Sequence, residues 1–150
     1  MRWFVAGSDA GGRSAITSAG EQHLSTDPAP VIERILATGD SPPPSVPGGV
    51  AMHRDLGVRT GLVEWRILRW GPGFSLPMHN TDTFDLNCVI EGAVELVLDD
   101  GVHPLRPGDC VAVAGVDHAW QAGDEGCVLA IALIGATPRP ASAPQPTTTE

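Results

Sequence analysis

Short apolar runs separated by glycine and proline constrain this chain more than any other feature. Between residues 61 and 134, strand-like runs alternate with turn-forming clusters such as Gly71-Pro72-Gly73 and Arg106-Pro107-Gly108-Asp109. The 150 residues include 18 Gly and 14 Pro, and no long stretch has helical periodicity. Short strands punctuated in this way favour a sandwich or a jelly-roll barrel over a helical bundle. The sequence therefore predicts an all-β fold.

The expected strands follow from alternating or continuous apolar runs between these turns. They are residues 3–6, 14–17, 61–70, 75–79, 84–90, 93–98, 103–105, 110–113, 118–121 and 127–133. Turns are expected at 91–92, 99–101, 106–109 and 123–126. In the run 61–70, Val63, Trp65 and Ile67 fall on one face, and Glu64 and Arg66 fall on the other.

The chain divides into an arm, a barrel and a tail. Residues 1–50 are expected to form an N-terminal β arm and a Pro-rich connector, with one short helix that begins at Asp27-Pro28. Residues 51–136 are expected to form the barrel. Residues 137–150, rich in Pro and Thr, cannot supply a core and are expected to be disordered.

Charge and hydropathy exclude several classes of protein. The net charge is −9 and all nine basic residues are arginine, so the basic face that nucleic acid requires is missing. The longest apolar run, near 128–134, is far shorter than a membrane span, and the N-terminal apolar run is too short for a signal peptide. Cys88, Cys110 and Cys127 are odd in number and scattered, which favours buried reduced thiols. We therefore expect a cytoplasmic protein that binds neither nucleic acid nor membrane.

Two stretches carry residues at a diagnostic spacing. In the first, Gly73, His79, Thr81, Asp85 and Gly92 are separated by five, one, three and six residues. In the second, Gly108-Asp109 opens a strand, Gly115 lies at a turn and His118 follows three residues later. This pattern resembles the two motifs of the cupin superfamily, although Thr81 stands where the family has His and Asp85 where it has Glu. The resemblance implies a double-stranded β-helix, or jelly-roll barrel, with one cupin unit.

A finer resemblance concerns small stand-alone cupins of polyketide and aromatic-metabolite pathways. It rests on residues 78–85, the 91–92 turn, residues 96–101 and residues 115–120, and on an N-terminal arm like the hairpin that precedes the barrel in those proteins. Leu86 departs from that subgroup, in which an aromatic residue is common, and the chain has no Tyr, which excludes a tyrosine acid or base. The resemblance implies the fold more firmly than the reaction.

Strand alternation predicts which side chains share the interior of the barrel. His79, Asp85 and His118 are the expected catalytic residues, carried into one pocket by three strands. If they point inward, their neighbours at alternate positions line the same pocket. The predicted pocket residues are Ser75, Thr81, Asn87, Val89 and Trp120.

The chemistry of this site stays open between two forms. Two imidazoles and a carboxylate, His79, His118 and Asp85, are ligands for Fe(II), Mn(II) or Zn(II). In the metal-free form, His118 or His79 acts as the general base or acid, and Asp85 orients it or takes the second proton-transfer role. His118 as base, His79 as acid or metal ligand and Asp85 as partner would suffice. Asp85 is one methylene shorter than Glu, which shortens its reach towards a metal.

Three functions follow from these alternatives. The first is a small-molecule enzyme of lyase, isomerase or cyclase type that transfers protons, with or without a metal. The second is a mononuclear metal-dependent oxygenase, and the third is a ligand-binding or sensory cupin without turnover. We favour the first, with a polyketide-like or aromatic metabolite as substrate, and we expect a homodimer. Trp3, Trp65 and Trp70 are expected in the core or a dimer contact, and Arg66 and Arg69 on a solvated face.

Overall fold

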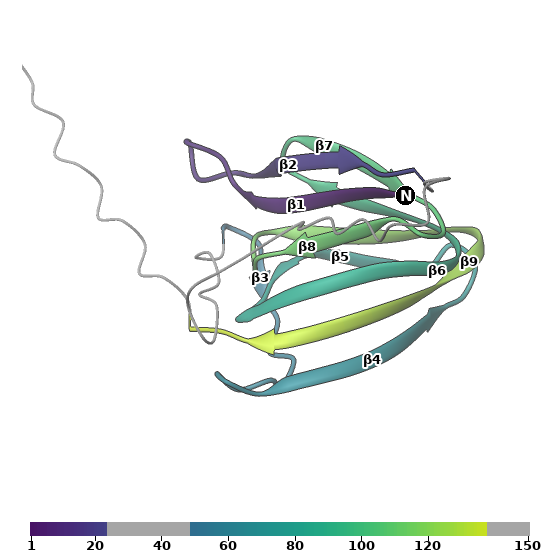
Figure 1. The fold of residues 1–150 in the computed structure, drawn as a ribbon. Helices are drawn as coiled ribbons and strands as arrows, with labels where there is room; N and C mark the ends of the chain where they lie inside the picture. The colour runs from purple at the N-terminus through teal and green to yellow at the C-terminus, as the bar shows by residue number, and fades with distance from the viewer. Residues whose placement is uncertain (24–48, 138–150) are drawn as a thin grey trace, which may run out of the picture.

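The computed structural model describes residues 1–23 and 49–137, which form nine strands and no helix (Figure 1). The strands are β1 (Arg2–Ser8), β2 (Ser14–Glu21), β3 (Met52–His53), β4 (Val63–Trp70), β5 (Ser75–Asn80), β6 (Thr83–Leu98), β7 (Gly101–Leu105), β8 (Cys110–Val113) and β9 (His118–Gly135). The predicted all-β fold is confirmed. The predicted helix, most of the Pro-rich connector and nearly all of the tail lie outside the described residues.

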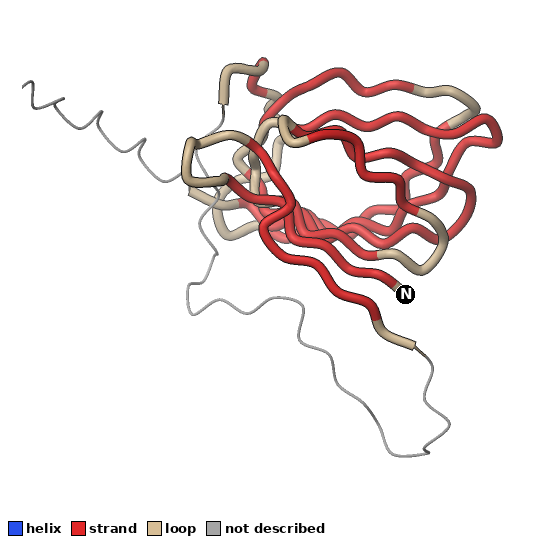
Figure 2. Tube along the Cα trace, turned by 90° about the horizontal axis from the view of Figure 1, so that it is seen from above, coloured by secondary structure: helices blue, strands red, loops and turns tan. Residues whose placement is uncertain are grey.

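One strongly curled sheet contains all nine strands. Its order is β2-β1-β8-β6-β9-β5-β3, with β4 added to β9 and β7 added to β6. Seen from above, the strands curl around a common interior (Figure 2). β6 and β9 pair along most of their length, and every other barrel strand adds to one of them or to a neighbour. Closing a sheet on itself in this way buries one face of each strand.

The two long strands replace predicted turns. The sequence suggested turns at 91–92 and 123–126, but β6 runs through the first and β9 through the second. The β6–β9 register shifts on both sides of Glu91 and Gly92, so the strand bulges and bends there. Gly92 has φ 70°, and a Cβ at this position would lie 2.0 Å from the carbonyl oxygen of Gly126. The glycine thus marks a close approach of two bent strands.

Hydrocarbon fills one half of the barrel. The main buried cluster is centred on Leu96, Val94, Val89 and Leu129, each at most 2% exposed. A smaller cluster, Val58, Ile131 and Leu133 with Leu56 and Leu68 against it, forms one wall of the other half. Packed side chains therefore fill only one end of the barrel, and a cavity remains between β4, β5, β6 and β9.

The N-terminal arm belongs to the barrel sheet. β1 and β2 form the predicted hairpin, and β1 runs parallel to β8 of the same chain. Arg2 anchors it: the Arg2 backbone N–H donates to Asp109 Oδ1 at 2.9 Å, and the guanidinium forms an ion pair with the same carboxylate. Asp109 is 3% exposed and also accepts from the backbone N–H of Arg106. One buried carboxylate therefore joins the arm to the turn before β8.

Replacing Arg2 with Ala is expected to lower the free energy of unfolding by about 1.5 kcal/mol, because buried Asp109 loses its charge-assisted hydrogen bonds. Chemical denaturation measures the change. Arg13→Ala is the matched control, since the side chain of exposed Arg13 donates to the Asp99 carbonyl oxygen and not to a buried carboxylate. We expect the control to stay within about 0.5 kcal/mol of the wild type. Equal losses in both variants would contradict the anchoring role.

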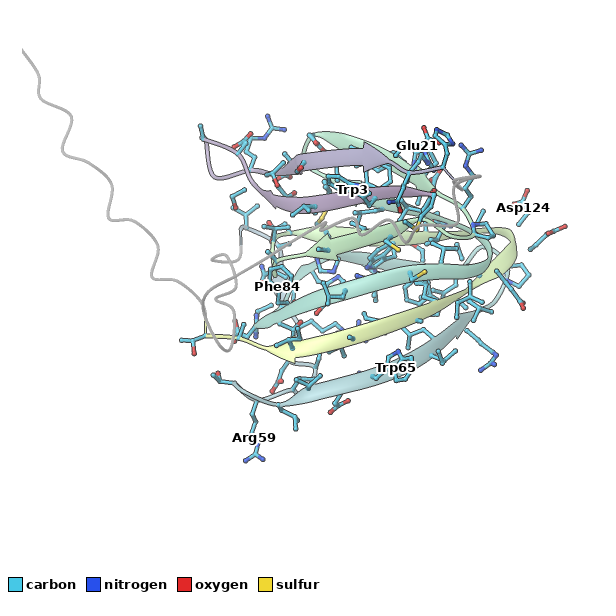
Figure 3. The ribbon with its side chains drawn as sticks, in the orientation of Figure 1. Trp3, Glu21, Arg59, Trp65, Phe84 and Asp124 are labelled. Atoms are coloured by element: carbon cyan, nitrogen blue, oxygen red, sulfur yellow. The ribbon has the colours of Figure 1, made fainter. Side chains whose placement is uncertain are left out.

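The outer face of β4 is apolar and exposed. Trp65 is 81% exposed, and Val63 and Ile67 are 62% and 46% exposed. Trp65 lies on the outermost strand in the view of Figure 3. Its prediction as a core residue is wrong, because the opposite face of β4 is the one that enters the barrel. The alternative role, a dimer contact, stays a prediction, as does the homodimer itself.

Two further features bear on the composition-based predictions. Cys127 is buried, Cys88 and Cys110 are half-buried, and no disulfide joins them. Among the described residues, no helix is long and apolar enough to cross a membrane.

Candidate active site

A cavity of about 190 Å³ occupies the unplugged half of the barrel. Its walls come from β4, β5 with its preceding turn, β6, β9 and the segment after β3. The lining residues are, in chain order, Arg54, Leu56, Arg66, Leu68, Trp70, Phe74, Leu76, His79, Asp85, Asn87, His118, Trp120, Ile131 and Leu133. A cavity of about 150 Å³ holds benzene, so this one suits a molecule with a single ring. Polar groups on an apolar wall are typical of small-molecule sites.

His79 and His118 form a pair on neighbouring strands. They are register partners of β5 and β9, and their ring centroids lie 4.3 Å apart. Each Nδ1 bonds a backbone carbonyl two residues earlier, Pro77 at 2.9 Å and Val116 at 2.7 Å. Because a carbonyl oxygen only accepts, both Nδ1 atoms carry the proton. In the neutral rings each Nε2 is therefore an acceptor.

Burial keeps both imidazoles neutral at pH 7. The pKa of His118 is lowered to about 4, mainly because burial removes the ring from water and in part because His79 lies next to it. Desolvation also lowers the pKa of His79, helped by the positive charge of Arg54, while the bond to the Pro77 carbonyl opposes the change. His79 is therefore a poor proton donor at neutral pH, in contrast to the acid role that the sequence suggested for it.

Asp85 lies in the same cavity with an unsatisfied oxygen. It is 5% exposed, and its Oδ1 has no hydrogen-bond partner among the described residues. Desolvation raises the pKa of this carboxyl to about 6, and the nearby Thr83 hydroxyl and Arg66 charge offset only part of that rise. A carboxylate whose pKa lies near neutrality can both take and return a proton. Asp85 is the group in this cavity with that property.

The three residues do not form a metal-binding group. Among residues 1–23 and 49–137, no three His, Cys, Asp or Glu side chains gather closely enough to hold a metal ion. The two imidazoles lie next to each other, with ring centroids 4.3 Å apart, but Asp85 does not join them in a group close enough to hold a metal ion. The arrangement therefore does not fit the three-ligand set proposed from the sequence. The metal itself stays a prediction.

The predicted pocket residues divide into two groups. Asn87 and Trp120 line the cavity. Val89 instead belongs to the packed core, and the buried Thr81 hydroxyl accepts a hydrogen bond from Thr83 at 3.0 Å. Ser75 is exposed, because the β5–β9 register shifts between Leu76 and His79 and turns Leu76 inward in its place. The expectation that Ser75 and His79 share a face is therefore wrong.

Several cavity residues were not anticipated from the sequence. Arg66 was expected on a solvated face, but it enters the cavity because β4 presents its Glu64–Trp70 face to the interior. Trp70 and Phe74 stack with centroids 5.2 Å apart at the turn between β4 and β5. The alternation of β4 places Arg66 on the same face as Leu68 and Trp70, but it does not say which face of the strand is inside. Arg54 belongs to neither sequence motif, so no pattern in the sequence indicates that it lines the cavity.

Comparisons with known proteins agree with this fold. Residues 64–127 match the family model of the AraC-like ligand binding domain. The chain is 36% identical over 56 residues to the cupin-domain-containing oxidoreductase srdD of Neurospora crassa, covering 37% of this chain and 29% of that protein. It is 37% identical over 57 residues to the phomopsin biosynthesis cluster protein C' of Diaporthe leptostromiformis, covering 37% and 30%.

The match thus spans less than a third of the length of these curated relatives. Among solved structures, the polyketide cyclase RemF of Streptomyces resistomycificus aligns with 23% identity and a TM-score of 0.44, over 47% of this chain and 53% of that one. The curled all-β sheet, the two motifs on β5–β6 and β8–β9 and the sequence relatives lead to one assignment. The chain has the fold of a small cupin and is similar in sequence to cupin-domain proteins.

Proposed function

We propose that this cupin is a small-molecule enzyme that moves a proton to and from carbon next to a carbonyl group. Lyase, isomerase and cyclase reactions share this step. The observation that carries the proposal is Asp85: a buried carboxyl with an unsatisfied oxygen, in a cavity with two neutral imidazoles. A base is most effective when its pKa lies near the working pH.

In the proposed step, ionised Asp85 removes a proton from carbon. The C–H electron pair moves into the carbonyl group, and the negative charge develops on the substrate oxygen. The Arg66 guanidinium lines the same cavity and can donate hydrogen bonds to that oxygen. The Nε2 atom of a neutral histidine accepts a hydrogen bond from a substrate hydroxyl. Asp85 then returns the proton to the same or another atom.

The proposal is tested by deuterium uptake in D₂O. Single-ring ketones that carry a hydroxyl group, beginning with 4-(4-hydroxyphenyl)butan-2-one and 4-hydroxyphenylpyruvate, are incubated with the protein, and loss of the α-proton signal is followed by NMR. We expect exchange faster than in buffer, and about 10-fold slower in His118→Gln, because one acceptor for the substrate is lost. His103→Gln is the control, since His103 pairs with Asp100 away from the cavity. No acceleration of either probe would contradict the proposal.

Two other functions each have one supporting observation. The name of the srdD relative supports an oxidoreductase, and with it the mononuclear metal oxygenase. Elemental analysis of untagged protein tests it: stoichiometric iron or manganese together with oxygen consumption would favour this reading. The match to a ligand-binding domain model supports a sensory cupin without turnover. In that case ligands would bind and no proton exchange would occur.

A further inference from the structure

Two arginines line the cavity of a strongly acidic chain. The protein has nine arginines and a net charge of −9, yet Arg54 and Arg66 both border one small interior space. The two histidines there are neutral, and Asp85 supplies at most one negative charge. The side chains that line the cavity therefore supply two guanidinium groups against one carboxyl group, although Glu64, outside the lining, pairs with one of the guanidinium groups.

Arg66 is fixed in a binding orientation. Its Nε donates to Glu64 Oε2 at 2.7 Å, and its Nη2 forms an ion pair with the same oxygen. A guanidinium has five N–H groups, so this bond leaves the Nη1 side available to a ligand. β4, β9 and β6 align Arg66, Ile131 and Asn87 in one row across the sheet. The guanidinium of Arg66 thus stands at the same level of the barrel as Asn87, whose amide already donates to the carbonyl oxygens of Asp85 and Val111.

Arg54 approaches from a second element. Its backbone N–H donates to the carbonyl oxygen of Asn80 at 2.8 Å, which ties the segment after β3 to the end of β5. Asp117 secures the same segment by accepting from the Asn80 amide and from the backbone N–H of Ala51. The charge of Arg54 is close enough to influence His79. The two arginines therefore approach the cavity from different parts of the chain, Arg66 from β4 and Arg54 from the segment after β3.

The other end of the cavity is aromatic. Trp70 stacks on Phe74, and the rings of Trp70 and Trp120 lie 6.1 Å apart. Trp70 is four residues from Arg66 along β4, a span of about 13 Å along the strand, so the aromatic group and the guanidinium lie towards opposite ends of the cavity. A ligand that satisfies both ends carries an apolar ring at one end and an anionic group at the other.

We infer that the cavity binds a small organic carboxylate, its apolar ring against Trp70 and Trp120 and its carboxylate at Arg66 and Arg54. Arginine and carboxylate match in geometry, since both are planar and pair through two parallel hydrogen bonds. This inference rests on the proposed function only in taking the cavity as the substrate site. It narrows the substrate class from ring-bearing carbonyl compounds to those that also bear an acid group.

The test compares 3-phenylpropanoate with its amide, 3-phenylpropanamide, by titration calorimetry. The two have the same number of heavy atoms and differ in charge. We expect the carboxylate to bind the wild type about 10-fold more tightly, in line with the strength of a charge-assisted hydrogen bond. Arg66→Gln is expected to abolish that preference. Arg69→Gln, on the same strand but with an exposed side chain, is expected to keep it.

Each outcome decides between the alternatives. Equal affinities for the two ligands, or a preference that survives in Arg66→Gln, would overturn the inference and leave the deuterium-exchange test of the proposed function untouched. Binding of neither ligand would also overturn it. If Arg66→Gln fails to fold, Arg54→Gln replaces it, because Arg54 is an exposed residue outside the strands. A several-fold loss of the preference in Arg54→Gln then supports the inference, and an unchanged preference contradicts it.

Discussion

Asp85→Asn is expected to slow catalysed deuterium exchange by at least about 100-fold, since general acid–base catalysis contributes about 10²–10⁴. Asn has nearly the same shape but cannot accept the proton. In the wild type, exchange should increase as pH rises through about 6, where Asp85 ionises, and then level off. NMR rates between pH 5 and 8 measure both effects.

Asp82→Asn is the matched control for this substitution. Asp82 lies three residues from Asp85, and Asp82→Asn removes the same negative charge. The Asp82 side chain, however, is 53% exposed and faces His53. We expect exchange within a factor of two of the wild type, as surface changes of this kind are nearly neutral. Retained activity in Asp85→Asn, or a comparable loss in Asp82→Asn, would show that another group moves the proton.

The same Asp85→Asn substitution is expected to stabilise the protein at pH 8, raising the free energy of unfolding by about 2–3 kcal/mol. Burial raises the pKa of this carboxyl from 3.8 to about 6. A raised pKa means that the folded state disfavours the ionised form, so stability is lost as pH rises from about 4 through 6. The neutral amide avoids that cost at pH 8. Near pH 3, where Asp85 is protonated in both states, the difference should vanish.

His118 acts in the opposite direction over an overlapping range of pH. Its pKa is lowered from 6.5 to about 4, so its contribution to stability is present above 6.5 and is lost as pH falls towards 4. In the wild type the two effects partly cancel between pH 4 and 6. Asp85→Asn should therefore lose stability on acidification more steeply than the wild type. Parallel stability curves, measured by urea denaturation across this range, would contradict the account of Asp85.

The fold and the core of the site could be predicted from the sequence. Turn residues at regular spacing indicated an all-β fold, although two of the predicted turns lie inside the long strands β6 and β9. The spacing of His79, Asp85 and His118 indicated three side chains in one interior, and all three line the cavity. The separation of the Asp85 carboxyl from the imidazoles depends on how far each side chain reaches into the barrel, which spacing along the chain does not record.

Two errors have identifiable physical causes. Pro77 has no N–H to donate to β9, and the pairing of β5 is irregular between Leu76 and His79, so strict alternation fails and Ser75 turns outward. On β4 both faces carry apolar residues, Trp65 on one and Trp70 on the other. The pattern therefore identifies two faces without saying which is inside. That ambiguity concealed Arg66.

The ionisation of Asp85 in the folded protein is the most direct test of the central claim. Carbon-13 NMR follows the side-chain carboxyl signal from pH 3 to 8, and the signal is assigned by its absence in Asp85→Asn. We expect a midpoint of about 6, as burial without a partner for Oδ1 requires. A midpoint at or below the ordinary 3.8 would mean that the carboxylate is solvated or paired, and would contradict its role in moving a proton.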